Sequence, residues 1–106
     1  MAQFDVHRNA GKHRDRIPYV VVIQSGLFDD YGRRVVVPLV RASSVGKIAN
    51  PLFNPTFKIG KTSVVLHPLE IVSVPLAQLA KPVASLATEG DRIIQALDDL
   101  LTRAWG

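Results

Sequence analysis

The sequence predicts a mainly β protein, a small antiparallel barrel or strongly bent sheet of about six strands with one C-terminal α-helix. Short runs of β-branched and apolar residues recur along the first two thirds of the chain, with turn-forming residues between them. From about Thr88 the apolar residues change to helical spacing. The 106 residues have the length of one domain, so residues 1–106 are assigned to a single domain.

The first expected strands lie on either side of a turn. Phe4 and Val6 alternate with polar residues, which predicts a half-buried strand, and His7 is expected to be solvated like the other histidines. After a turn at residues 9–12, the run Tyr19–Gln24 is rich in β-branched residues and is expected to be a central strand.

The next strand, Arg34–Val40, contains Pro38, which has no N–H to donate to a neighbouring strand. The proline predicts an edge position or a bulge. Residues 42–55 are rich in serine, asparagine and proline and are expected to form a connecting loop with one short strand or turn.

The remaining apolar runs complete the expected sheet. They predict a hairpin of Thr56–Ile59 and Thr62–His67 around Gly60-Lys61, then a strand Glu70–Val74 closed by Pro75, and a stretch at 76–86, broken by Pro82, along the end of the barrel.

A C-terminal helix is expected from about Thr88 to the end of the chain. Thr88 is the expected N-cap, and Glu89 and Asp91 suit the positive end of the helix dipole. One apolar stripe is expected to face the sheet, formed by Ile93, Leu97, Leu100, Leu101 and Ala104. The only tryptophan, Trp105, extends the edge of this stripe, and either packs on its own domain or is held out for a partner.

Composition limits the classes of function. There is no cysteine, hence no disulfide framework, and no apolar run is long enough to cross a bilayer or resembles a signal peptide, so a cytoplasmic protein is expected. The net charge of +4 favours an acidic partner. Much of the excess lies early in the chain, in Arg8, Lys12, Arg14 and Arg16, which form either a solvated turn or a site for an acidic ligand.

No catalytic site, metal site or cofactor is predicted. The three histidines lack metal-ligand spacing, no nucleophile has an evident base, and no glycine-rich phosphate loop is present. One alternative remains, because arginines gathered on one sheet face with an acid or a histidine could cleave RNA. The residues for that reading are Arg14, Arg16, Arg33 and Arg34 with Asp29, Asp30 or His67.

Several segments of the chain resemble the CcdB family of toxins from bacterial toxin–antitoxin pairs. The segments are Gln24-Ser25, Gly32-Arg33-Arg34-Val35-Val36-Val37-Pro38-Leu39, Gln3-Phe4 with Val6, Ile59-Gly60, Ser73-Val74-Pro75 and the closing Trp105-Gly106. They keep the family order and span the whole chain.

The resemblance implies a small antiparallel SH3-like barrel with a C-terminal helix, and a homodimer that is not an enzyme. Such toxins bind the A subunit of DNA gyrase on cleaved DNA and trap that complex. A CcdA-like antitoxin with a disordered acidic segment releases gyrase, and the toxin contacts operator DNA, and thereby represses its own operon, only together with the antitoxin.

The resemblance also implies the residues of the gyrase contact. These are Trp105, Gly106, Leu27, Phe28, Asp98 and Leu101. The best-known members end Trp-Gly-Ile, and an alignment without gaps places their tryptophan on Thr102. Trp105 therefore follows three residues later, about 4.5 Å further along a helix. Two alternatives are an RNA-cleaving toxin of a related barrel fold and a CcdB-like protein that has lost toxicity and binds only its antitoxin.

Overall fold

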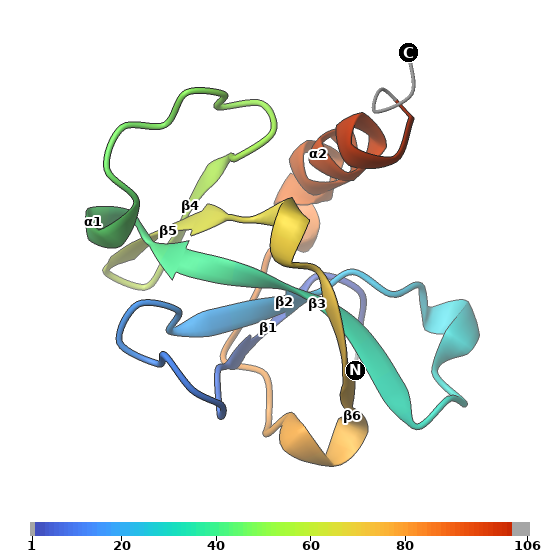
Figure 1. The fold of residues 1–106 in the computed structure, drawn as a ribbon. Coiled ribbons are helices and arrows are strands. Elements are labelled where there is room, and N and C mark those ends of the chain that lie inside the picture. The colour runs from blue at the N-terminus through green and yellow to red at the C-terminus, as the bar shows by residue number, and fades with distance from the viewer. Residues whose placement is uncertain (1, 103–106) are drawn as a thin grey trace.

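The computed structural model describes residues 2–102 of the chain (Figure 1). Its strands are β1 (Asp5–Arg8), β2 (Tyr19–Val22), β3 (Arg33–Arg41), β4 (Thr56–Ile59), β5 (Thr62–Leu66), β6 (Val72–Pro75) and β7 (Ala84–Ser85). The α-helices are α1 (Ala42–Val45) and α2 (Gly90–Thr102). The 3-10 turns are η1 (Gly26–Phe28), η2 (Pro68–Glu70), η3 (Leu76–Gln78) and η4 (Ala87–Glu89).

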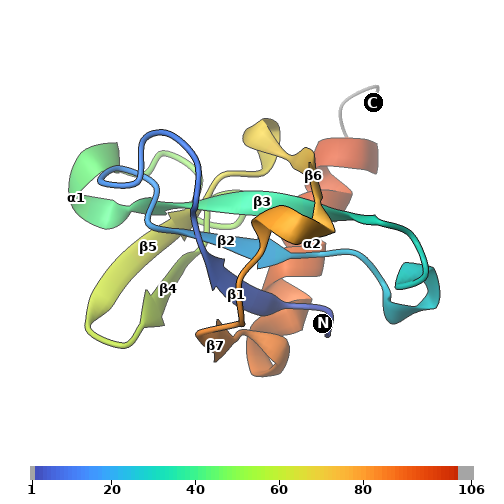
Figure 2. The same cartoon turned by 90° about the horizontal axis from the view of Figure 1, so that it is seen from below.

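The strands pair antiparallel in the order β4-β5-β3-β2-β1-β7, and β6 pairs with the first half of β3. This path curls into a nearly closed barrel, and α2 lies along it (Figures 1 and 2). Valines of the sheet and Ile93 and Leu97 of α2 share one buried core. The expected fold class is confirmed, as are the central position of β2 and the hairpin of β4 and β5, whose turn residue Gly60 has a φ of 61° that favours glycine.

The expectation of an edge or a bulge at Pro38 is wrong, because β3 lies inside the sheet. It pairs with β2 on one side and with β5 and β6 on the other. The N–H of Arg41 and the carbonyl of Val35 bond toward the β2 side, to Arg16 and Ile23. Bonding direction alternates along an antiparallel strand, so Pro38 faces the other side. There β3 changes partner: its pairing with β6 stops at Val36, and its pairing with β5 starts at Leu39. The proline thus occupies the one gap where no donor is required.

The expectation that His7 is solvated is also wrong, since its side chain is fully buried. Side chains alternate between the two faces of a strand, so His7 points to the outer face of β1 and Val6 to the inner face. The segment before β7 covers that face, and His7 Nδ1 lies 2.7 Å from the carbonyl oxygen of Ala80. The covering segment follows far later in the sequence, so the local pattern did not show it.

The stretch 42–55 is a connecting loop with a turn at residues 51–53, as expected, and it begins with the short helix α1. Two other segments differ from expectation. The strand expected at Glu70–Val74 begins at Val72, after the turn η2. The stretch 76–86 contains β7, which pairs with β1 and was not expected.

Helix α2 begins at Gly90, immediately after η4, so Thr88 lies within that turn and not before it. The hydroxyl of Ser85 accepts the N–H of Ala87 at 3.2 Å. The buried face of α2 consists of Gly90, Ile93, Ala96 and Leu97. Leu101 is 71% exposed, so its expected place in the buried stripe is wrong, because the stripe turns away from the sheet in the last described turn.

Two contacts attach α2 to the sheet. The ring of Phe4, whose φ of 69° is left-handed, packs on Gly90 so closely that an added Cβ would lie 2.6 Å from Cε2 of the ring. Arg92 lies over the Phe57 ring at 4.6 Å and donates to the carbonyl oxygen of Thr56 at 3.0 Å. Thr56 belongs to β4, which has no second strand partner among residues 2–102, so Arg92 covers part of that edge.

Within residues 2–102, none of the helices has the length and hydropathy needed to cross a membrane.

Candidate partner-binding surfaces

Two of the expected gyrase-contact residues lie on the loop between β2 and β3. Leu27 is 86% exposed and Phe28 is 50% exposed. The hydroxyl of Ser25 accepts the N–H of Leu27 at 3.2 Å and caps η1. Tyr31 follows, 66% exposed, with its ring 6.1 Å from that of Phe28 and inclined by 62°. The loop therefore presents apolar and aromatic side chains to the outside.

Two side chains hold this loop, the buried Arg34 and the half-buried Gln24. Arg34, 3% exposed, donates to the carbonyl oxygens of Tyr31 at 2.7 Å, Arg33 at 2.8 Å and Asp29 at 3.0 Å. Gln24 donates to the carbonyl oxygen of Phe28 at 3.0 Å and accepts the N–H of Val35. This role of Arg34 and Gln24 was not predicted from the sequence, although both lie in segments that resemble the CcdB family.

The other expected contact residues lie on the last turns of α2. Asp98 and Leu101 are exposed, and the Thr102 hydroxyl donates to the carbonyl oxygen of Asp98 at 2.5 Å. Trp105 and Gly106 lie outside the described residues. In Figures 1 and 2 the end of α2 and the loop after β2 lie apart, so the structure does not join the described contact residues in one pocket.

The basic residues expected to bind an acidic partner gather at the opposite end of β2. Lys12, Arg14 and Arg16 are exposed around an open hollow of about 860 Å³ lined by residues 10–16. Arg8 is also exposed and lies over the ring of Tyr19 at 6.0 Å. Within residues 2–102, none of these four cations forms an ion pair. Their charge is therefore available to an anionic partner.

The backbone of this basic loop is held by two side chains, Asn9 and Arg41, and contains one residue with a positive φ. Asn9 donates to the carbonyl oxygens of Lys12 and Ile17 at 3.1 and 2.9 Å and accepts the N–H of Gly11 at 2.9 Å. His13 has a φ of 63°, and its carbonyl oxygen accepts the N–H of Ile17 at 2.7 Å. Sequence reasoning missed Arg41, which reaches this end of the sheet and donates to the carbonyl oxygen of Asp15 at 2.9 Å.

The arginines of the RNA-cleaving alternative do not gather at one site on the sheet. Arg33 and Arg41 mark the two ends of β3, and Arg16 lies beside Arg41, so Arg16 and Arg33 are roughly 26 Å apart along the strand. Arg34 is buried and holds the loop backbone, and Arg33 donates to both oxygens of Ser73 at 2.9 Å. Among the described residues, no three His, Asp or Glu side chains group so that they could hold a metal ion.

A third surface is apolar and follows η2 into β6. Leu69, Ile71 and Val72 are 67%, 40% and 47% exposed. Figures 1 and 2 both place η2 beside α2, and η2 contacts that helix.

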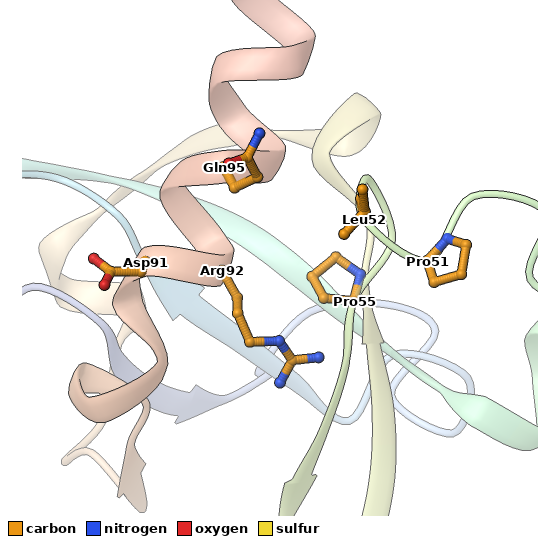
Figure 3. Close-up of a pocket in the computed structure, with 6 residues that line it drawn as sticks. All are labelled: Pro51, Leu52, Pro55, Asp91, Arg92 and Gln95. Carbon is orange, nitrogen blue, oxygen red and sulfur yellow. The ribbon is translucent and has the colours of Figure 1, made fainter.

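A hollow of about 250 Å³ separates the loop before β4 from the start of α2 (Figure 3). In Figure 3 Leu52 faces the helix, the Arg92 side chain extends toward Pro55, and Asp91 points away. Arg92 is engaged by Glu89 and Thr56, so the hollow offers mainly apolar walls. No residue of the expected contacts lies in it.

Comparison of the chain with models of protein families gives one finding. The model described as CcdB protein matches residues 3–103. The match covers almost the whole chain and includes both loops at the ends of β2.

Proposed function

Because the chain belongs to the CcdB family of toxin–antitoxin toxins, we propose that it binds the A subunit of DNA gyrase on cleaved DNA and traps that complex. It acts in the cytoplasm, where its target is found, and residues 1–106 act as a single toxin domain. The poison works by binding and not by catalysis.

The observation that carries this proposal is the exposure of Leu27 and Phe28 on a loop that is fixed from inside. Large apolar side chains held in water at fixed positions are typical of residues that anchor a partner. Both stand at the positions that the family resemblance assigns to the gyrase contact.

The proposed contact continues on the last turns of α2. Asp98 and Leu101 are exposed and available to a partner. Trp105 and Gly106 complete the contact in this proposal. A tryptophan that fills a partner's pocket is a common hot-spot residue, so its removal is the most informative truncation.

The partner that releases gyrase is a CcdA-like antitoxin with an acidic segment. Arg8, Lys12, Arg14 and Arg16 are proposed to bind that segment, because their charges are exposed and unpaired within residues 2–102. A disordered acidic segment would order on this basic surface as it binds. Operator DNA is bound only together with the antitoxin.

The toxin is proposed to be a homodimer. Leu69, Ile71 and Val72 expose apolar side chains on either side of Glu70, and a chain this short gains stability by burying such side chains against a second copy.

The gyrase contact is favoured over the RNA-cleaving alternative. The arginines of that alternative do not gather at one site, because they are dispersed along β3 or bonded to backbone carbonyl oxygens.

The test is inducible expression in a susceptible bacterium, together with a cleavage assay with purified gyrase and plasmid DNA. The intact chain should arrest growth and accumulate linear DNA, whereas a chain without Trp105-Gly106 should do neither. Growth arrest that persists after this truncation contradicts the proposed contact. A chain that never arrests growth but binds the antitoxin would instead be a toxin-like protein that has lost toxicity.

A further inference from the structure

We propose that Arg34 and Gln24 are positioning residues that hold residues 25–32 as a rigid platform, on which Tyr31 joins Leu27 and Phe28 in contacting the partner. This inference rests on the function proposed above, because the partner is the A subunit of gyrase. It adds one contact residue and two residues that act through the loop backbone.

Arg34 has the geometry of a clamp. Its buried guanidinium donates to three successive parts of the loop, the carbonyl oxygens of Asp29, Tyr31 and Arg33. An ion pair with the Asp29 carboxylate at 3.7 Å adds to these bonds. Only a planar fork with several N–H donors can reach all three oxygens, so lysine cannot replace it in full.

Gln24 closes the other side of the loop. Its amide nitrogen donates to the carbonyl oxygens of Phe28 at 3.0 Å and Arg33 at 3.3 Å, and its amide oxygen accepts the N–H of Val35 at 3.0 Å. One side chain therefore links the end of η1 to the start of β3. The two clamps together engage the carbonyl oxygens of residues 28, 29, 31 and 33.

Tyr31 enlarges the surface that the clamps support. Its ring and that of Phe28 meet edge to face above a hollow of about 320 Å³, which Gln24, Arg33 and Val35 also line. The hollow can take an apolar side chain of the partner, and the Arg33 cation at its rim favours an acidic neighbour. The surface is continuous with Leu27 and Phe28, so one partner covers all of it.

Rigidity has a direct consequence for affinity. A loop that is ordered before binding loses little conformational entropy when the partner arrives, whereas a loose loop gives up part of the interaction free energy to become ordered. Removing the Arg34 clamp should therefore weaken the gyrase contact even though the Arg34 side chain is buried and does not line the contact surface.

The positioning role is tested with Arg34→Lys, which keeps the charge but loses the fork, and Arg92→Lys as the matched control elsewhere. Three quantities are measured on the full chain: backbone amide exchange, affinity for purified gyrase A subunit, and affinity for an acidic antitoxin peptide. Arg34→Lys should raise exchange at residues 26–32 at least tenfold while Val37 and Leu39 keep theirs, weaken gyrase binding about tenfold, and leave the peptide affinity unchanged. Arg92→Lys should change none of these in the loop.

Exchange that rises equally in the loop and at Val37 and Leu39, or does not rise at all, overturns the positioning role. If Arg34→Lys does not fold, amide exchange in the loop of Gln24→Met decides the question, and the gyrase affinity of that variant is left out because Gln24 also lines the hollow. The loop-exchange result does not depend on the identity of the target, so it stands even if the chain fails to bind gyrase.

The contact role of Tyr31 is tested with Tyr31→Ala against Leu52→Ala, a similarly exposed residue remote from the loop. Tyr31→Ala should weaken gyrase binding at least tenfold, and Leu52→Ala should not; equal affinities overturn the contact. If the chain arrests growth without binding gyrase, the proposed target is wrong, and loss of arrest in Tyr31→Ala still supports the platform. If the chain neither binds gyrase nor arrests growth, the contact role of Tyr31 falls with the proposed function.

Discussion

The two loops that flank β2 differ in how their backbones are held and in what they show to solvent. The loop after β2 is fixed by the buried Arg34 and by Gln24, and it displays apolar rings. The loop before β2 is held by Asn9 and by the partly exposed Arg41, encloses an open hollow, and displays cations that form no ion pair within residues 2–102. One strand thus separates a rigid apolar surface from an open basic surface.

The difference indicates two kinds of partner. A rigid apolar surface favours a folded partner that already has a matching pocket, because shape decides the affinity. An open basic surface favours a flexible acidic chain, because charge attraction tolerates many conformations. The two surfaces lie at opposite ends of β2, so each partner's contact can be altered separately by mutation.

Gly90→Val is expected to have the largest effect, because it alters a close contact between α2 and the rest of the domain, on which both loops depend. The added Cβ would lie 2.6 Å from the Phe4 ring, and overpacking should lower the free energy of unfolding by about 3 kcal/mol. Chemical denaturation measures this, and amide exchange should rise in both loops alike. Gly32→Ala, with no atom within 4 Å of its added Cβ, is the control. A stability equal to that of the parent chain contradicts the close Phe4 contact.

Arg34→Met should affect only the loop after β2. It removes three charge-assisted donors from the loop while keeping the buried length of the side chain, so the free energy of unfolding should fall by about 2 kcal/mol. Denaturation together with proteolysis within residues 26–32 measures the change. Cleavage in residues 10–16 that increases to the same extent would show that the effect is not local.

Asn9→Ala is the corresponding change in the basic loop before β2. It removes two bonds to loop carbonyl oxygens and the acceptor of the Gly11 N–H, and should lower stability by about 1 kcal/mol. Thermal unfolding measures the shift. Binding of an acidic peptide should weaken less than twofold, because charge and not loop shape governs it. A tenfold loss would show that both loops depend on a fixed shape.

Arg14→Gln should have the smallest effect, and it should appear in binding and not in stability. Removal of one exposed cation should weaken acidic-peptide binding by about 0.5 kcal/mol and reduce its salt dependence. Titration at several salt concentrations measures both. Thr62→Gln, remote from the basic loop, serves as the neutral control, and gyrase affinity should stay unchanged in both variants.

Much of the fold was predictable because local patterns reported it. Alternating apolar residues and a two-residue glycine turn predicted β4 and β5, and helical spacing predicted α2. His7 and Pro38 were misjudged for a common reason: their surroundings are made by segments more than 25 residues away in the sequence. The segment that covers His7 and the change of partner strand at Pro38 cannot be predicted from the residues adjacent to these two positions in the sequence.

The candidate site was predictable to a smaller extent. The family segments pointed to Leu27 and Phe28, whose exposure fits a contact surface, but composition alone treated Arg34 as one more surface cation. The signal that could have found its role is the spacing of Arg34 from Asp29 across a glycine-containing loop, which lets one guanidinium span the turn. Tyr31 was missed because its partner, the Phe28 ring, becomes a neighbour only once the loop is closed.

The bond from Arg92 to the carbonyl oxygen of Thr56 bears on how the protein behaves at high concentration. An uncovered strand edge is a template on which further chains can add in register, the first step toward fibrils. A single guanidinium occupies an acceptor on that edge and stacks on the neighbouring Phe57 ring. We therefore expect solubility during purification and storage to depend on Arg92, a helix residue outside both proposed binding surfaces.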